Sequence, residues 1–287
     1  MSKTGTPRLA DQRGAVFLLT DYGETDEFAG LTRAIVLKYG PGAPVVDLTH
    51  GVPAFDVRAG ALVLSRSVGH LGPGVVVGVV DPGVGGDRRA VAVAVDGGAG
   101  GPGGGPRYLI GPDNGLLGWA IEILGGPVAA VCLTPAAGPS RTFDGRDVFA
   151  PAAGRLWSGA SLHDIGIPID PGTLVELPRP VLEVGPGALE AEVLWVDRFG
   201  NVQLSARPAD AERAGLAGVV EIGTATAAAN REGRAVASFA ELEGDEVGLL
   251  VDANGQLALV CDRRPAATVL GVRPGDIVTL APVFDVS

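Results

Sequence analysis

An aspartate and an arginine seven residues apart are the first pair in this sequence that could do chemistry. Asp81 and Arg88 lie in the polar turn of VVVGVVDPGVGGDRRAVAVAV, between two valine-rich runs that are typical of buried strands. Ligands of open α/β sheets bind beyond the carboxyl ends of strands, and Asp81 follows the first run. The loop is long enough to bring the Arg88 guanidinium back to the carboxylate. The plainer interpretation is a turn aspartate and a surface arginine.

The elements that would position this pair form strand, loop and helix units. A strand at residues 16–20 is followed by a polar loop and by the helical spacing of residues 27–39. The pattern repeats with a strand at 44–48 and a helix at 55–68. Further strands are expected at 108–110 and 128–133, with helices ending near residues 124 and 157. Alternating strands and helices indicate a parallel, helix-covered sheet whose polar loops gather at one edge.

A glycine run at residues 97–106 interrupts this pattern. It matches neither the dinucleotide nor the phosphate-loop spacing, and no Lys-Ser/Thr follows it. We interpret it as a flexible hairpin loop.

The second part of the chain differs in composition and periodicity. Residues 171–187 are rich in proline and have little helical periodicity, which predicts a linker. Short strands follow at residues 189–196, 201–204, 219–222, 246–251, 256–261 and 276–280. We therefore predict a flexible tail at 1–14, a Rossmann-like α/β domain with a mostly parallel sheet at 15–180, and a small antiparallel β-barrel domain at 181–287.

Composition excludes several classes of function. The 287 residues carry a formal charge of −11, and no basic stripe that would bind nucleic acid is present. The hydrophobic fraction of 46% describes a globular protein, but no run is long and uninterrupted enough to span a membrane. Two cysteines and a polar N-terminus without a signal-peptide core favour the cytoplasm.

Six motifs occur in a specific order along the chain. They are LLTDYG at 18–23, VVDLTHGVPAFD at 45–56, VVDPGVG at 79–85, GPDNG at 111–115, TFDGRDVFAP at 142–151 and DRFGN at 197–201. In this combination the chain resembles the S-adenosylmethionine (SAM) hydroxide adenosyltransferases, which are relatives of fluorinase and chlorinase. The resemblance covers nearly all of residues 15–281.

The resemblance implies an enzyme that attacks C5′ of SAM with a water-derived hydroxide, giving adenosine and L-methionine. It implies no metal and no redox cofactor, because the sulfonium is already a good leaving group. It also implies a homotrimer whose sites lie between the N-terminal domain of one subunit and the C-terminal domain of the next. Such an enzyme must place the nucleophile in line and exclude bulk water.

Four residues of the first domain take roles by this resemblance. Asp21 is expected to bind both ribose hydroxyls, although a carboxylate that caps a helix is the alternative. Asp26 is expected at the methionine ammonium. Asp81 and Arg88 match two members of the family's Asp, Arg, His set that binds water. Halogenating relatives carry an aromatic residue in place of this Asp, and a carboxylate repels a halide while it orients a water.

The third member of the set is where this sequence departs from the family. The family has a histidine before Gly-Arg-Asp, whereas this chain has Asp144. An aspartate is shorter than histidine, is normally anionic, and competes with Asp81 for the charge of Arg88. His50 is the one histidine that follows a strand and could approach the pocket in its place. None of the three histidines has metal-ligand spacing, so no metal site is predicted.

The resemblance extends to an aromatic residue of the first domain and to a loop of the second. Phe55 occupies a place where relatives have an aromatic residue near the ribose, with a core-facing helix residue as the alternative. Asn201 is expected to bind the adenine edge, Phe199 to pack on the base, and Asp197 to face the methionine amino group. An amide, an aromatic ring and a carboxylate suit those three partners.

The sequence leaves other functions open. The chain could bind adenosine or SAM without catalysis, because the histidine of the family set is replaced by Asp144. Chloride-dependent halide transfer is a further alternative that Asp81 disfavours, and a metal-dependent hydrolase is a weak fourth. Product formation, rather than binding, separates the first two possibilities.

Overall fold

The structure is a computed structural model that describes residues 14–96, 104–105, 107–134, 142–225 and 230–283. It divides into two compact units, residues 1–177 and residues 178–287, each with its own core. The predicted tail and most of the glycine-rich loop at 97–106 lie outside the described residues.

The first unit is built on one sheet, which has seven strands among the described residues. In spatial order they are β2 (Val45–Thr49), β1 (Ala15–Thr20), β3 (Gly74–Val79), β5 (Tyr108–Pro112), β4 (Ala90–Val95), β6 (Pro127–Leu133) and β7 (Gly166–Ile169). The pairs from β2 to β5 are parallel, whereas β4 and β7 run antiparallel to their neighbours. The prediction of a mostly parallel sheet in an α/β fold is therefore confirmed.

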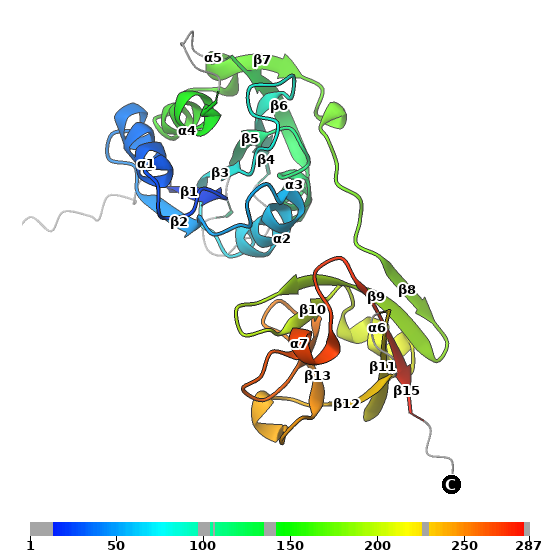
Figure 1. Ribbon diagram of the computed structural model, residues 1–287. Helices are drawn as coiled ribbons and strands as arrows, with labels where there is room; N and C mark the ends of the chain where they lie inside the picture. The colour runs from blue at the N-terminus through cyan, green and yellow to red at the C-terminus, as the bar shows by residue number, and fades with distance from the viewer. Residues whose placement is uncertain (1–13, 97–103, 106, 135–141, 226–229, 284–287) are drawn as a thin grey trace, which may run out of the picture. The chain divides into compact units, whose positions relative to one another are not determined.

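Helices cover both faces of this sheet (Figure 1). They are α1 (Phe28–Tyr39), α2 (Val57–Val68), α3 (Gly118–Ile123), the π-helix η1 (Gly145–Phe149), α4 (Ala150–Trp157) and α5 (Leu162–Ile165), followed by the 3-10 turn η2 (Pro171–Thr173). Helices α1 and α4 pack together on one face, and α2 and α3 pack together on the other (Figure 1).

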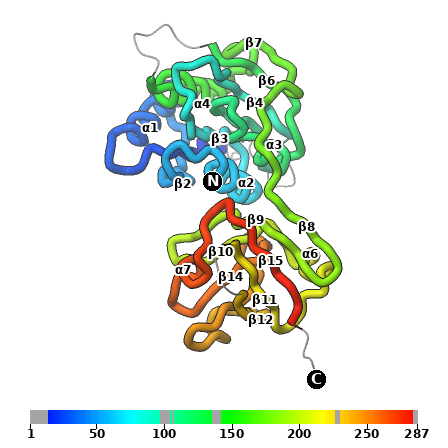
Figure 2. The backbone as a smooth tube through the Cα atoms, turned by 45° about the vertical axis from the view of Figure 1, so that its right-hand side comes forward, coloured from blue at the N-terminus to red at the C-terminus, as the bar shows by residue number. Residues whose placement is uncertain are grey.

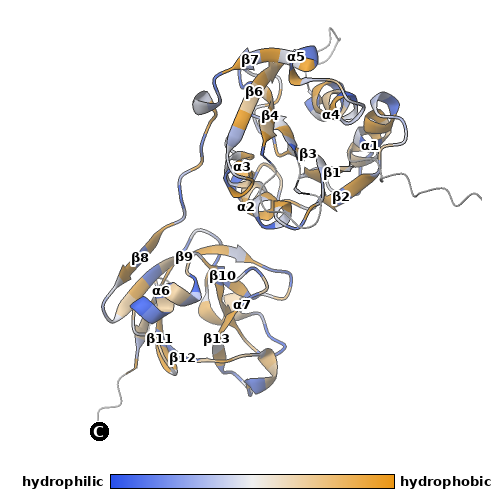
Figure 3. Ribbon diagram, turned by 180° about the vertical axis from the view of Figure 1, so that it is seen from behind, coloured by the Kyte–Doolittle hydropathy of each residue, from blue (hydrophilic) through white to orange (hydrophobic). Residues whose placement is uncertain are grey.

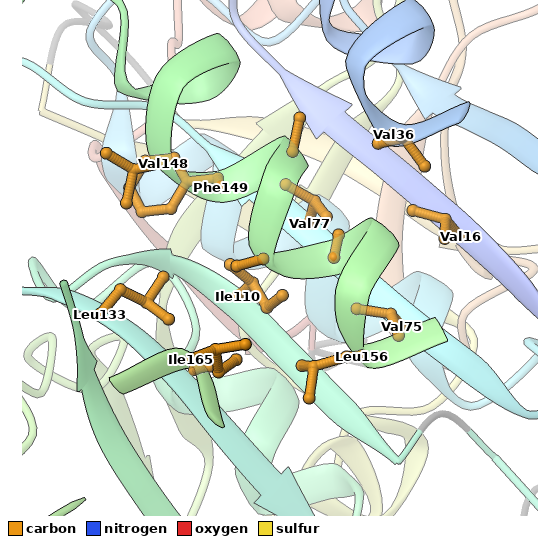
Figure 4. Packing of buried hydrophobic residues seen from close by; sticks show 14 of the residues in the cluster. Val16, Val36, Val75, Val77, Ile110, Leu133, Val148, Phe149, Leu156 and Ile165 are labelled. Atoms are coloured by element: carbon orange, nitrogen blue, oxygen red, sulfur yellow. The ribbon is translucent and has the colours of Figure 1, made fainter. Parts of the chain in front are cut away.

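Alternate residues of the central strands supply the two halves of the core. Val16, Val75, Val77 and Ile110 face α4 and its residue Leu156 (Figure 4). The neighbouring side chains on the same strands are also buried, so the strands are apolar on both faces. This burial explains their near-continuous valine runs, which cannot face water on either side.

The second unit contains a closed barrel. Its strands are β9 (Ala188–Val196), β10 (Val202–Leu204), β11 (Val219–Thr224), β12 (Arg231–Ala235), β13 (Val247–Val251), β14 (Leu257–Val260) and β15 (Ile277–Pro282), with β8 (Leu182–Gly185) added outside β9. Pairing of β10 with both β14 and β9 closes the barrel, and β15 lies between β11 and β9 (Figure 2). The predicted antiparallel barrel is confirmed, although the pair β12–β13 is parallel.

Short helical segments connect the barrel strands. They are α6 (Pro208–Arg213), the 3-10 turn η3 (Phe239–Glu241) and α7 (Ala266–Leu270). Helix α6 has no buried residue and is drawn partly in the blue of hydrophilic residues in Figure 3. The predicted linker at 171–187 was too long at its C-terminal side, because strand β8 forms within it.

Candidate functional site

The polar residues of the first unit meet at one edge of the sheet. Strands β1 and β3 are parallel neighbours, so Asp21 and Asp81, which follow them, leave the sheet at the same edge. The backbone N–H of Asp21 donates to the carbonyl of Val79 at 3.3 Å, which fixes the start of its loop against β3. This edge is where an open sheet binds its ligands.

Arg88 joins two carboxylates at this edge. Its Nε lies 3.0 Å from both carboxylate oxygens of Asp81, and its Nη2 contacts both Asp81 and Asp144. The side chains of Asp81, Arg88 and Asp144 are only 6%, 13% and 17% exposed. The guanidinium carbon also lies 5.5 Å from the ring centroid of Phe149, which covers it from the core side. The structure thus brings together the three residues that the sequence suggested for chemistry.

Turn geometry explains how Arg88 returns to Asp81. The N–H of Val84 donates to the carbonyl of Asp81, and the N–H of Gly86 donates to that of Gly83. Gly85 adopts a φ of 77°, which residues with a β-carbon rarely adopt. Two tight turns therefore reverse the chain within the loop.

Asp144 stands at the start of the π-helix η1. Its side chain makes no capping hydrogen bond with that helix, and it bonds to Arg88 instead. A β-carbon at the next residue, Gly145, would lie 2.0 Å from the hydroxyl oxygen of Tyr22, so a larger residue there would displace that side chain. Single π-turns inside helices are frequent at functional sites, because they redirect one side chain.

A cavity of about 200 Å³ lies beside these carboxylates. It is lined by Asp21, Tyr22, Phe28, Phe55, Val79, Asp81, Val84, Thr142, Phe143, Asp144 and Gly145. The rings of Tyr22, Phe28 and Phe143 pack against one another with centroid distances of 5.0 to 5.8 Å. An apolar aromatic wall thus faces three carboxylates, as suits a ligand with a flat apolar part and polar or cationic groups.

The environment shifts two ionisable groups of the site. Burial raises the pKa of the Tyr22 phenol, and the negative charges of Asp21, Asp81 and Asp144 raise it further, so the phenol stays protonated. Burial alone would lower the pKa of Arg88, but its hydrogen bonds to Asp81 and Asp144 outweigh this effect and raise the pKa. Arg88 therefore remains a cation between two carboxylates.

Asp21 has a second partner at the cavity. Its Oδ2 accepts a hydrogen bond of 2.9 Å from the backbone N–H of Phe55. Phe55 has a φ of 68°, and its side chain is 71% exposed on the cavity lining. The expected helix at 55–68 instead begins at Val57, because Asp56 caps it through Ala59. Phe55 is therefore neither a helix residue nor part of the core.

Two other candidates lie outside this cavity. Asp26 is exposed and is not among the lining residues. His50 is buried, with Nδ1 at 2.8 Å from the Thr20 hydroxyl and Nε2 at 3.1 Å from Asp47. His50 is not among the residues that line the cavity, and its ring contacts Thr20 and Asp47 instead.

The remaining candidates share a loop of the second unit. Asp197, Phe199 and Asn201 lie between β9 and β10, and Phe199 is 69% exposed. The carboxylate of Asp197 accepts hydrogen bonds from the backbone N–H groups of Phe199 and Asn201 at 2.9 Å, and from the Asn201 amide at 2.7 Å. Asp197 thus closes the loop that presents the other two side chains.

Sequence reasoning missed several residues of the cavity. Tyr22, Phe28, Val84, Thr142 and Phe143 line it without having been singled out. Four of them, all but Phe28, lie within the motifs at 18–23, 79–85 and 142–151, and that position was the only sign in the sequence that they belong to the site. Their side chains are aromatic, apolar or hydroxyl groups, which sequence patterns assign to cores and turns as readily as to sites.

The described residues contain neither a metal-binding cluster nor a membrane-spanning helix. Among the residues that the structure describes, no three or more His, Cys, Asp or Glu side chains gather as they would around a metal ion. None of the described helices is both long and apolar enough to cross a bilayer.

Both parts of the chain are similar in sequence to known proteins. Residues 16–166 match the model of the SAM hydroxide adenosyltransferase N-terminal domain, and residues 191–279 match that of its C-terminal domain. A protein from Salinispora tropica named (R)-S-adenosyl-L-methionine hydrolase is 42% identical over 261 residues, which cover 90% of this chain and 94% of that protein. A fluorinase from an Actinoplanes species is 27% identical to this chain. That match covers 98% of this chain and 99% of the fluorinase.

A solved structure shares the fold of this chain. An uncharacterized conserved protein from Thermotoga maritima superposes with a TM-score of 0.82 at 27% identity, over 93% of this chain and 99% of that chain. Both domain models match in the expected order, and together they span most of both units. The chain belongs to the SAM hydroxide adenosyltransferase family.

Proposed function

We propose that this protein hydrolyses S-adenosyl-L-methionine to adenosine and L-methionine. The single observation that carries the proposal is Arg88 held between Asp81 and Asp144, two carboxylates that line an aromatic cavity. The identity of 42% to a protein named as a hydrolase of the (R) form of SAM supports it, and we expect the same sulfonium form to be the substrate.

The proposed reaction is a displacement at C5′ of the ribose. The water oxygen forms a bond to C5′ while the bond from C5′ to the sulfonium sulfur breaks, and its electron pair goes to sulfur. The products are adenosine, neutral methionine thioether and one proton. No metal or redox cofactor is needed in this proposal, because the positively charged sulfur is the leaving group.

The three polar residues divide this work. Asp81 accepts a hydrogen bond from the water and orients its lone pair toward C5′. Arg88 pairs with both carboxylates and stabilises developing hydroxide. Asp144 takes the place of the family histidine as a second acceptor. Asp21 binds the ribose hydroxyls, and Asp26 is proposed for the methionine ammonium.

The second unit supplies the adenine and methionine contacts in this proposal. Asn201 binds the adenine edge, Phe199 packs on the base with Phe55 near the ribose, and Asp197 faces the amino group. By its resemblance to the family, the protein is proposed to act as a homotrimer with sites between subunits, which light scattering in solution tests. The free thiols of Cys132 and Cys261 support the proposed cytoplasmic location.

Charge argues against halide transfer. One guanidinium faces two carboxylates, so this part of the site carries a net negative charge that repels fluoride or chloride. The non-catalytic binding protein remains the second candidate, and the observation that favours it is an aspartate in place of histidine at position 144.

The test is product formation by the purified protein. Adenosine and methionine are measured by liquid chromatography and mass spectrometry, with and without chloride and chelator. We expect equal amounts of both products, unaffected by either additive, and a loss of at least about 100-fold in kcat for Asp81→Ala with SAM still bound. SAM binding without adenosine would favour the binding protein, and a halogenated nucleoside would favour halide transfer.

A further inference from the structure

The GPDNG motif has no part in the proposed chemistry. It lies at the C-terminal end of β5, next to the loop that carries Asp81 and Arg88. Residues 80–89 leave the sheet at β3 and return at β4, and β5 lies between these two strands. Asp113 and Asn114 follow β5 directly. The loop that carries Asp81 and Arg88 therefore passes over them.

Asn114 holds the β3 end of this loop. Its Nδ2 donates to the carbonyl oxygen of Val80 at 2.9 Å, and its Oδ1 accepts from the N–H of Leu116 at 3.2 Å. Val80 is fully buried and directly precedes Asp81. A buried carbonyl that loses its donor costs free energy, so this bond fixes the backbone from which Asp81 projects.

Asp113 holds the β4 end. Its backbone N–H donates to the carbonyl of Arg89 at 2.9 Å, and its Oδ2 accepts from Arg89 Nε at 2.7 Å. The same carboxylate accepts from the N–H of Val175 at 2.9 Å, while Arg89 Nη1 donates to the Thr173 hydroxyl at 2.9 Å. Asp113 is 8% exposed, so its pairing with Arg89 is poorly screened by water.

Arg88 and Arg89 are thus neighbours with different partners. Arg88 bonds to Asp81 and Asp144, whereas Arg89 bonds to Asp113 and Thr173. Arg89 thus ties the β4 end of the loop to Asp113 and to the segment at Thr173.

We propose that Asp113 and Asn114 are positioning residues for the reaction, which fix both ends of the loop so that Asp81 and Arg88 face each other. This inference rests on the proposed hydrolysis of SAM. Neither residue lines the cavity, so both act through the loop and not on the substrate.

The experiment compares wild type, Asp113→Asn and Asn114→Ala. Because small misplacements of reacting groups are costly, kcat should fall about 10- to 100-fold while KM changes less than about threefold. Hydrogen exchange should become faster at the amides of Val84 and Gly86, and stay unchanged in the strands of the second unit. The exchange result does not depend on turnover, so it tests the positioning even if the proposed function fails.

Asp164→Asn is the matched control. Asp164 also accepts bonds from a backbone N–H and a hydroxyl, both of Ser161, but it lies at α5. Its variant should keep wild-type kcat and wild-type exchange in the loop.

Wild-type kcat in folded Asp113→Asn, or a raised KM with unchanged kcat, would overturn the proposal. Asp113→Asn preserves side-chain size and therefore decides the question if Asn114→Ala does not fold. A wild-type protein that forms no adenosine would refute the proposed function instead.

Discussion

Two carboxylates and one guanidinium carry the proposed chemistry of this site at the scale of single residues. A histidine at position 144 would be neutral or cationic, whereas Asp144 adds a negative charge beside Arg88. The aspartate keeps a hydrogen-bond acceptor at position 144, where the family has histidine. It also makes Arg88 share its positive charge between Asp81 and Asp144. Its effect should therefore appear in the chemical step more than in substrate binding.

Asp144→His should raise kcat about 10-fold, because a neutral imidazole accepts the water proton without competing for Arg88. Steady-state adenosine formation at neutral pH measures this change. Asp147→His is the matched control on the same helical segment, since Asp147 pairs with Arg146 and does not line the cavity. A lower kcat for Asp144→His would show that the aspartate is a working member of the site and not a weakened one.

Tyr22 makes stability depend on pH at the alkaline end. The folded chain keeps the phenol proton above the ordinary pKa of 10.0, whereas the unfolded chain loses it. The unfolded state then binds fewer protons, so the free energy of unfolding falls as pH rises above about 10. Tyr22→Phe lacks this titration, and its free energy of unfolding should fall less steeply in urea titrations between about pH 9 and 11.

The control for this measurement is Tyr39→Phe, which removes a phenol outside the cavity. It shows how much of any change in the pH profile comes from removing a phenol as such. If the profiles of Tyr22→Phe and wild type were parallel, the phenol proton would be held no more tightly in the folded protein than in the unfolded chain.

Charged groups within motifs were the residues that the sequence located best, although their roles stay predictions. Asp21, Asp81 and Asp144 were singled out from the sequence and do line one cavity. Tyr22 and Phe143 were missed, because an aromatic residue next to a motif could equally belong to the core. The exposed position of Asp26 outside the cavity could not be predicted from the sequence, because it depends on how the loop before α1 folds.

At the scale of elements, the loop before α2 shows how the fold stores strain beside the site. Phe55 is held in the left-handed region by its bond to Asp21, and its ring is exposed rather than packed. Strained backbone of this kind persists where surrounding bonds impose it, and it is common at binding sites.

Comparing Phe55→Gly with Phe55→Ala separates the backbone from the ring. Glycine accepts a positive φ, so Phe55→Gly should unfold with a free energy about 0.5–1 kcal/mol higher than Phe55→Ala in urea titrations. Both variants lack the ring and should raise the KM for SAM. Equal stability of the two would mean that Asp21 does not impose the left-handed conformation.

The elements themselves were mostly predictable, but their order in the sheet was not. Valine-rich periodicity located β1, β3 and β4, because buried strands need apolar side chains on both faces. Nothing in that periodicity shows that β5 lies between β3 and β4, since strand order depends on pairing between distant segments. Strand β12 was missed because its sequence REGRA is polar and lacks the alternation typical of a half-buried strand.

At the scale of the whole molecule, two units with separate cores carry the two sets of candidate residues. Asp81, Arg88 and Asp144 belong to the first unit, and Phe199 and Asn201 to the second. The change of texture after residue 170 predicted this organisation, because helical periodicity gives way to short strands. The charge of −11 suits a cationic substrate such as a sulfonium, which long-range attraction would draw toward the protein.

The most direct test of the central claim is turnover of SAM in oxygen-18 water. Attack of water at C5′ predicts enzyme-dependent adenosine that carries one oxygen-18 atom in its 5′-hydroxyl, with an equal amount of methionine, as seen by mass spectrometry. Asp81→Ala should form little or no labelled adenosine. Adenosine without the label, or SAM that is bound but not converted, would contradict the account.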